Sequence, residues 1–354
     1  MKKFAVLFAA LLQSFLAYSQ EAESDNGQFI VIPRVDVNGY FLPATDGGDE
    51  GNGIDLGDSS FYTLIEGSFG ESDFSYSIAN HWLSSDPMSL YSNTLRSDDL
   101  NWVDWAYVNW APGAFDFTIG KNMIAIGTFE EDEYDFNSYS PLSSLLWNSL
   151  QAYQWGVSMG WTSPDEGSYI EANIAASPYG ERPFQSGLYA YSARYTGEYG
   201  FYKGIWSANM LDFGDGIQKL YTAGNQFYLN DSWTATLDAY AMFTPATCYT
   251  GSRAHMFNWG VVPSITFDNG GRFTATVKFI MEDNKQIDGL VDFEHPTFDT
   301  DNLALGTVLN WYPLRDSRNL RVHGFAGMGG GMTDGYFAGI GATYFLDLKP
   351  LFRR

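Results

Sequence analysis

The stretch RFTATVKFIME, residues 272–282, indicates which class of fold the chain adopts. Apolar residues occupy every second position: Phe273, Ala275, Val277, Phe279 and Met281. Polar residues occupy the positions between them, with Ile280 as the exception: Arg272, Thr274, Thr276, Lys278 and Glu282. Because successive side chains of a strand point to opposite faces, this period of two predicts a β-strand with one apolar and one polar face.

The same alternation recurs along the chain in sixteen segments, separated by clusters of Gly, Asp, Asn, Ser and Pro. We place them at 28–42, 59–69, 73–83, 99–111, 114–127, 150–162, 168–178, 187–197, 200–210, 217–228, 232–243, 254–267, 271–282, 302–312, 319–328 and 336–347. Short turns alternate with mostly longer, acidic loops. A soluble sandwich would also alternate, but an even strand number with short turns on one side is typical of outer-membrane barrels.

The predicted strands need a closed arrangement if they face lipid. The chain has no uninterrupted apolar run of about 18 residues, so the sequence predicts no transmembrane helix. Lipid offers no partner to backbone N–H and C=O groups, and an open sheet edge is therefore excluded. We expect an all-β fold, a transmembrane antiparallel β-barrel of about sixteen strands, whose lumen is wide enough to hold water. An aromatic content of 17% suits the Trp and Tyr girdles of such a barrel.

The N-terminus is typical of a signal peptide. Lys2 and Lys3 precede an apolar stretch and small residues, which predicts cleavage after Ser19 and a single barrel domain over 20–354. The alternative, a membrane anchor, is disfavoured because Gln13 and Ser14 interrupt the apolar stretch. The first strand follows closely, which leaves no room for a plug domain. The mature chain would carry 17 basic and 42 acidic residues, a net charge of −25, so nucleic acid is not an expected partner.

Two hairpins resemble a known family. Residues 105–110 (WAYVNW) with 115–121 (FDFTIGK), and residues 305–313 (LGTVLNWYP) with 319–322 (NLRV), are similar to hairpins of the phosphate-selective porin O/P-type family. The two stretches cover about a fifth of the chain. The resemblance implies a sixteen-stranded, trimeric porin in the outer membrane of a Gram-negative cell. The proposed cleavage site between Ser19 and Gln20 is similar to signal sites of Bacteroidota-type secreted proteins. The resemblance also implies passive diffusion of small hydrophilic solutes or ions. Phosphate selectivity is not carried over, because the family's dense Arg and Lys ladders are missing here.

The third long loop carries the densest charge of the chain. In trimeric porins this loop folds into the barrel, and the resemblance therefore implies an acidic constriction, although a solvent-exposed outer loop is the alternative. The loop's acidic residues are Glu130, Glu131, Asp132, Glu133 and Asp135. Rings of carboxylates favour cations.

A basic wall is expected across the lumen from this loop. The candidates are Lys121, Arg194, Lys203, Arg272, Lys278 and Arg321. Basic wall against acidic loop would make a transverse field, unless some of these residues lie at the rims and pair with loop acids. Lys121 shares the parity of Phe115 and Phe117, so it needs a bulge near Gly120 or a place above the membrane. Asp104 shares the parity of Trp110 and is expected outside the lipid zone for the same reason.

Other chemistry has weaker support in the sequence. The acidic stretch 46–55 is a candidate for Ca²⁺ but lacks the spacing of a known calcium loop, and no other cofactor is expected. Divalent ions between loop acids and lipopolysaccharide are a further candidate interaction. The four histidines are scattered and Cys248 is single, so no catalytic or metal motif is formed and no enzyme is expected. The alternatives to a channel are a non-conducting barrel subunit of a larger complex, an adhesin, an apolar-solute transporter and a barrel lipase.

Overall fold

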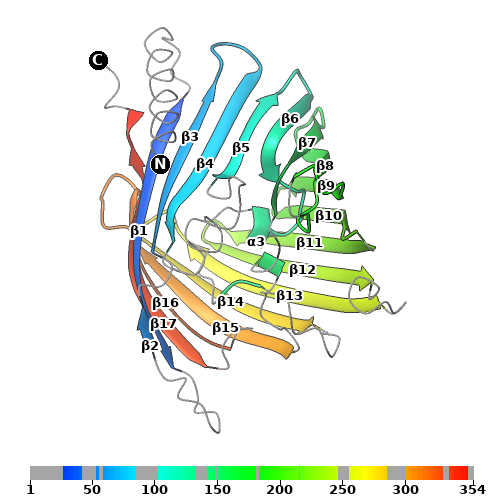
Figure 1. Ribbon diagram of the computed structural model, residues 1–354. Coiled ribbons are helices and arrows are strands. Elements are labelled where there is room, and N and C mark those ends of the chain that lie inside the picture. Colours follow the sequence, from blue (N-terminus) through cyan, green and yellow to red (C-terminus); the bar gives the residue numbers. More distant parts are fainter. Residues whose placement is uncertain are drawn as a thin grey trace, which may run out of the picture.

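The computed structural model is a closed antiparallel β-barrel of sixteen long strands (Figure 1). It describes residues 27–41, 53–55, 59–84, 103–132, 142–144, 146–147, 150, 152–180, 183–214, 216–245, 255–284, 300–329 and 335–349. The ring closes because β1 (Gln28–Phe41) pairs with β3 (Ser60–Ser68) on one side and with β17 (Tyr336–Tyr344) on the other. Two short strands, β2 (Gly53–Asp55) and β18 (Leu346–Asp347), add to the same sheet.

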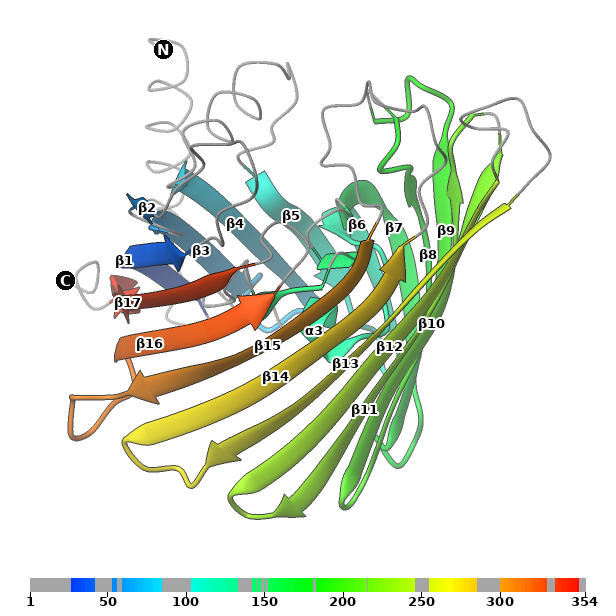
Figure 2. The ribbon, with the colours of Figure 1, turned by 90° about the horizontal axis from the view of Figure 1, so that it is seen from below.

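Consecutive strands are neighbours all the way round the ring (Figure 2). They are β4 (Phe74–Ser84), β5 (Val103–Trp110), β6 (Phe115–Met123), β7 (Tyr153–Thr162), β8 (Ser168–Ala176), β9 (Tyr189–Tyr199), β10 (Tyr202–Asp212), β11 (Ile217–Asn230), β12 (Trp233–Pro245), β13 (His255–Asp268), β14 (Phe273–Asn284), β15 (Thr300–Trp311) and β16 (Leu320–Gly329). Each expected segment corresponds to one long strand, so the predicted fold class and strand number are confirmed. The proposed signal peptide lies outside the described residues.

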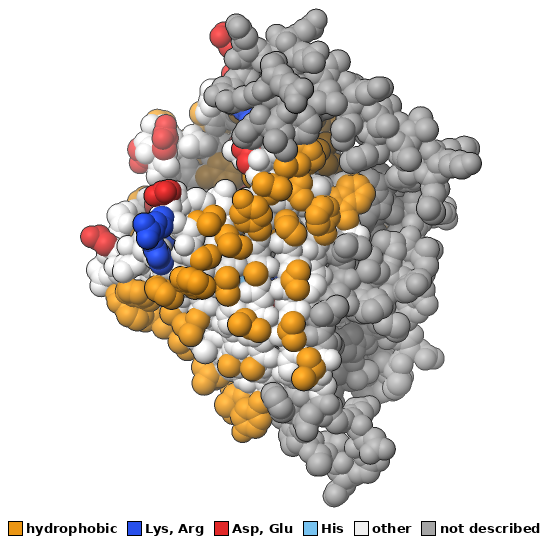
Figure 3. Space-filling model, turned by 90° about the vertical axis from the view of Figure 1, so that its left-hand side faces the viewer, with side chains coloured by type: hydrophobic (Ala, Val, Ile, Leu, Met, Phe, Trp, Pro, Cys, Tyr) orange, Lys and Arg blue, Asp and Glu red, His pale blue; other side chains and the backbone are white. Residues whose placement is uncertain are grey.

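The two faces of the barrel differ as the alternation predicts. On β14, Val277 is 45% exposed and points outward, whereas Thr274 and Glu282 are buried on the inner face. Figure 3 shows hydrophobic side chains spread over one outer face of the barrel, with most of the visible charged side chains gathered toward one edge. Ile280, the exception in the polar row, points inward and packs with Val262 and Ala304 of the neighbouring strands. None of the helices in the described ranges has the length and apolarity to cross a membrane.

The seam of the barrel, where β1 meets β17, contains a buried contact between an acidic and a histidine side chain that reaches across to β16. Asp36 on β1 and His323 on β16 both pair with Gly341, which lies between them on β17. The Nε2 atom of His323 lies 2.6 Å from Oδ1 of Asp36, and both side chains are fully buried. Arg34 donates to the other oxygen of Asp36 at 2.6 Å. Gly341 permits this contact because a side chain there would occupy the space between Asp36 and His323.

An ion pair joins two hairpins at the end of the barrel that carries the short turns. Arg318, in the turn between β15 and β16, donates two hydrogen bonds of 2.7 Å to the carboxylate of Asp268 at the end of β13. The ring of Tyr312 lies 4.7 Å from the guanidinium. The hydrogen bonds to Asp268 raise the pKa of Arg318, so the guanidinium stays charged. Arg272, one of the predicted wall residues, precedes β14 in the neighbouring turn and is exposed there, at the rim of the barrel.

Candidate functional site: a loop held inside the barrel

The third loop enters the barrel. β6 was expected to continue to residue 127 but ends at Met123, because the chain then leaves the wall. Ile124 and Ile126 pack inside the barrel against Ala175, Ala190 and Leu211, which come from β8, β9 and β10. The short helix α3 (Phe129–Asp132) follows, and Figures 1 and 2 both show it within the ring of strands. Later loop residues pack on other parts of the wall: Leu142 packs with Phe325 of β16 and Phe337 of β17, and Leu146 packs with Leu220 of β11 and Tyr240 of β12.

Backbone hydrogen bonds hold the loop to the inner wall. The N–H of Gly127 donates to Ser207 Oγ at 3.0 Å and to Thr222 Oγ1 at 2.8 Å. Gly127 lies so close to β10 that a Cβ would stand 2.6 Å from the backbone nitrogen of Ser207. The wall at this point therefore requires a glycine in the loop.

Asp238 on β12 makes the second anchor. Its two carboxylate oxygens accept the N–H groups of Phe129 and Glu130 at 2.9 and 3.0 Å. These are the first two residues of α3, whose N–H groups have no partner within the helix. One buried side chain thus satisfies the start of the helix and fixes its place in the lumen. The sequence showed Asp238 only as one polar residue in an alternating strand, and no motif marked it as an anchor.

The acidic loop meets the basic wall directly at Glu130. Its carboxylate lies 3.0 Å from Lys278 Nζ on β14 and also accepts the N–H of Ser144 at 3.1 Å. Lys203 Nζ lies 5.4 Å from the centre of the Phe129 ring. The sequence predicts a transverse field between the acidic loop and the basic wall. At this pair the prediction needs correction, because the two charges are in contact and offset each other. The side chains of Glu131 and Asp132, and all of Glu133 and Asp135, lie outside the described residues.

The other predicted wall residues fall in different surroundings. Arg194 faces inward and pairs with Glu171 at 2.9 Å. Arg321 is buried on the inner face of β16, beside the seam. Lys121 is buried and donates to the carbonyl of Val103 at 2.6 Å. It follows Gly120, whose φ of 139° departs from that of a regular strand, but the pairing of β6 with β5 and β7 continues through Gly120 without a bulge. The role of these residues in lining a pore stays a prediction.

A β-bulge between β4 and β5 gives Asp104 a polar partner. The register shifts where Ala79 pairs with Trp105 and Asn80 pairs with Val103, so Asp104 falls in the extra position. Its carboxylate lies 2.6 Å from Nδ1 of His81 on the neighbouring strand. Its place outside the lipid zone stays a prediction.

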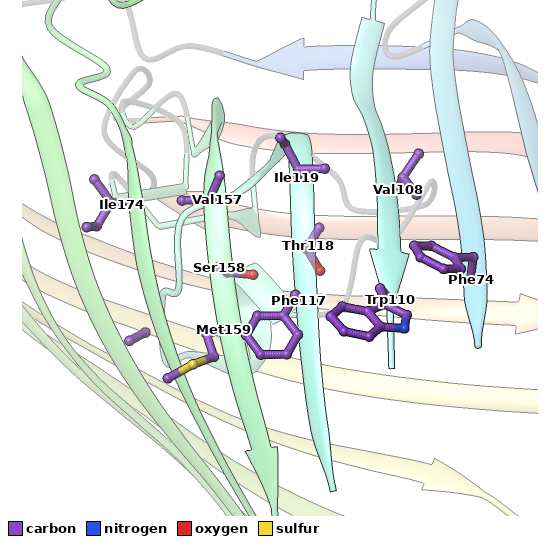
Figure 4. A pocket seen from close by; sticks show the side chains of 11 residues that line it. Phe74, Val108, Trp110, Phe117, Thr118, Ile119, Val157, Ser158, Met159 and Ile174 are labelled. Carbon is purple, nitrogen blue, oxygen red and sulfur yellow. The ribbon is translucent and has the colours of Figure 1, made fainter. Parts of the chain in front are cut away.

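An apolar groove lies on the outside of the barrel, across β4–β8 (Figure 4). It has a volume of about 530 Å³. Its lining includes two neighbouring rows of side chains: Phe74, Trp110, Phe117 and Met159 in one, and Val108, Ile119, Val157 and Ile174 in the other. Most of these side chains are exposed on the outer face, so the groove belongs to the surface that would face lipid and is separate from the lumen.

The barrel is similar in fold to solved outer-membrane proteins. OmpT of Vibrio cholerae, solved in a trimer form, is 12% identical with a TM-score of 0.57, and the match covers 91% of this chain and 100% of that one. A mutant of the porin of Rh. blastica is 14% identical with a TM-score of 0.57, and the match covers 90% of this chain and 100% of that one. The fold is that of a porin.

At this identity the likeness shows the porin fold alone. No family model and no curated protein matches the sequence, so membership of the phosphate-selective O/P-type family stays a prediction. Within the described ranges, no three or more His, Cys, Asp or Glu side chains are placed to hold a metal ion. The candidate Ca²⁺ stretch lies largely outside those ranges, since only residues 53–55 of it are described.

Proposed function

We propose that the protein is an outer-membrane porin, a water-filled channel for passive diffusion of small hydrophilic solutes or ions. The observation that carries this proposal is the closed sixteen-stranded barrel, apolar outside and polar inside, with a loop held in its lumen. A ring of this size is too wide for its own side chains to fill, so water enters it. The anchored loop then sets how much of that lumen a solute can use.

The surroundings of the channel form part of the same proposal. The apolar outer face suits the lipid of a Gram-negative outer membrane, and the acidic external loops suit divalent ions shared with lipopolysaccharide. We propose a homotrimer, since the Vibrio cholerae protein of the same fold was solved in a trimer form. Cross-linking of the detergent-purified protein is expected to give a band at three times the mass of the single chain. A monomer at all concentrations would contradict the trimer.

Ion preference is the second element of the proposal. The net charge of −23 and the acidic third loop favour small cations or neutral solutes over anions, and they argue against strong phosphate selectivity. Purified protein in planar bilayers is expected to give stepwise conductance. In a KCl gradient its reversal potential should have the sign of cation preference. A clear anion preference would refute the selectivity, and absence of any conductance would favour a non-conducting barrel subunit or an adhesin.

A further inference from the structure

The third loop divides the inner wall into two unequal parts. Its named contacts run from Ala175 on β8, through β10–β12 and β14, to Phe337 on β17. The remaining arc, formed by β1 and β3–β7, lies across the barrel from α3 (Figures 1 and 2). A solute that passes through the lumen therefore travels between the loop and this second arc.

Two carboxylates on the loop side lie in contact with basic groups, and two others, Asp238 and Glu282, are buried and accept N–H and O–H groups. Glu130 is paired with Lys278, and Glu171 with Arg194, at 3.0 and 2.9 Å. A close ion pair has little net field at a distance, because the two charges nearly cancel for an ion several ångströms away. These pairs therefore contribute little to the choice between cations and anions.

Two carboxylates on the opposite arc have neutral partners instead. Glu66 on β3 faces Ser77 in register, and Ser77 is buried on the inner face. The Ser77 hydroxyl donates to Glu66 at 2.9 Å. Asp116 on β6 lies between the outward-facing Phe115 and Phe117, so it points inward, and it accepts the hydroxyl of Tyr169 at 3.1 Å. Hydroxyl donors stabilise a carboxylate without removing its charge.

The other charged groups on this arc leave it acidic. Asp104 lies beside His81, and Lys121 is buried with its ammonium on the carbonyl of Val103. Arg34 and Asp36 on β1 pair with each other. The carboxylates of Glu66, Asp104 and Asp116 outnumber the basic side chains, His81 and Lys121, among the described residues of β3–β7.

We propose that Glu66 and Asp116 determine the ion selectivity of the channel, and that the ions they favour are small monovalent cations. This inference rests on the proposed porin function and goes beyond it, because it moves the selectivity from the third loop to the wall that faces the loop. A cation near this wall meets the charge of carboxylates whose hydrogen-bond donors are neutral hydroxyls. An anion meets the same charge as a barrier.

The test compares the cation-to-anion permeability ratio of isosteric variants in planar bilayers under a KCl gradient. Glu66→Gln and Asp116→Asn keep an acceptor oxygen for Ser77 and Tyr169, so they remove charge without removing the hydrogen bond. Each is expected to lower the ratio by up to about tenfold, because one unit charge across roughly 6 Å of water changes the permeability of the cation about threefold and that of the anion about threefold in the opposite sense. The double variant is expected to lower it further.

Two control variants test whether charges outside this wall set the ion selectivity. Glu130→Gln combined with Lys278→Gln removes the loop pair together, and it is expected to change the ratio less than either wall variant does. Glu71→Gln removes one carboxylate from an exposed short turn, where salt screens it, and is also expected to leave the ratio unchanged.

The outcomes distinguish the inference from the function on which it rests. A conducting channel whose ratio is unmoved by Glu66→Gln and Asp116→Asn overturns the inference and leaves the porin intact. A ratio that falls only in the loop double variant also overturns it, and places the selectivity in the third loop. An unsubstituted protein that never conducts overturns the porin proposal itself and the inference with it.

Discussion

Asp238→Ala is expected to raise the single-channel conductance and to admit solutes larger than the unsubstituted channel accepts. The carboxylate is buried and holds the first two N–H groups of α3. A hydrogen bond to a charged group contributes about 1.5–3 kcal/mol, and alanine removes both bonds at once. The start of the helix then loses its anchor, and the loop moves away from its fixed place in the lumen. Planar-bilayer recordings and swelling of liposomes in sugars of graded size measure the result.

Asp238→Asn provides the graded comparison for this anchor. The amide keeps one acceptor oxygen and replaces the other with a donor, so one of the two N–H groups keeps its partner. Its conductance is expected to fall between those of the unsubstituted protein and Asp238→Ala. Asp316→Ala, in an exposed turn, controls for loss of one acidic residue elsewhere. Equal conductance in all four proteins would show that Asp238 does not position the loop.

Gly341→Ala is expected to weaken closure of the barrel. The new methyl would enter the space between the carboxylate of Asp36 and the imidazole of His323, which are fully buried and lie 2.6 Å apart. Breaking a buried polar pair of this kind destabilises a protein by about 3–5 kcal/mol. The strands concerned are β1, β16 and β17, the first and the last two long strands of the ring, so the loss falls where the barrel closes. Heat-modified migration on SDS gels, followed against temperature, should show unfolding at a lower temperature than in the unsubstituted protein.

Gly324→Ala supplies a matched control on the neighbouring strand β16. A Cβ at this position would come no closer than 3.7 Å to the carbonyl oxygen of Gly339. The chemical change is the same as in Gly341→Ala, but no polar contact is interrupted. We expect its unfolding temperature to stay near that of the unsubstituted protein. The same decrease in both variants would mean that loss of any glycine in this region, rather than loss of the Asp36–His323 contact, weakens the barrel.

Local features of the sequence were enough to predict the strands and their two faces. In residues 272–282 the period of two reports which side chains face outward, because that alternation is a property of the strand itself. Closure followed from the chemistry of lipid, which leaves no open edge, and the observed pairing of β1 with β17 agrees with it.

The tertiary structure alone determined which side chains meet across the lumen. Asp238 is 109 residues from Phe129, Lys278 is 148 residues from Glu130, and Asp36 is 287 residues from His323. The period of two predicts that Asp238, Lys278, Asp36 and His323 face inward. It does not predict which residue each of them contacts. That choice depends on the register of every strand between them and on the path of the third loop. The physical reason is that strand alternation arises from neighbouring residues, whereas these contacts form only when the ring has closed.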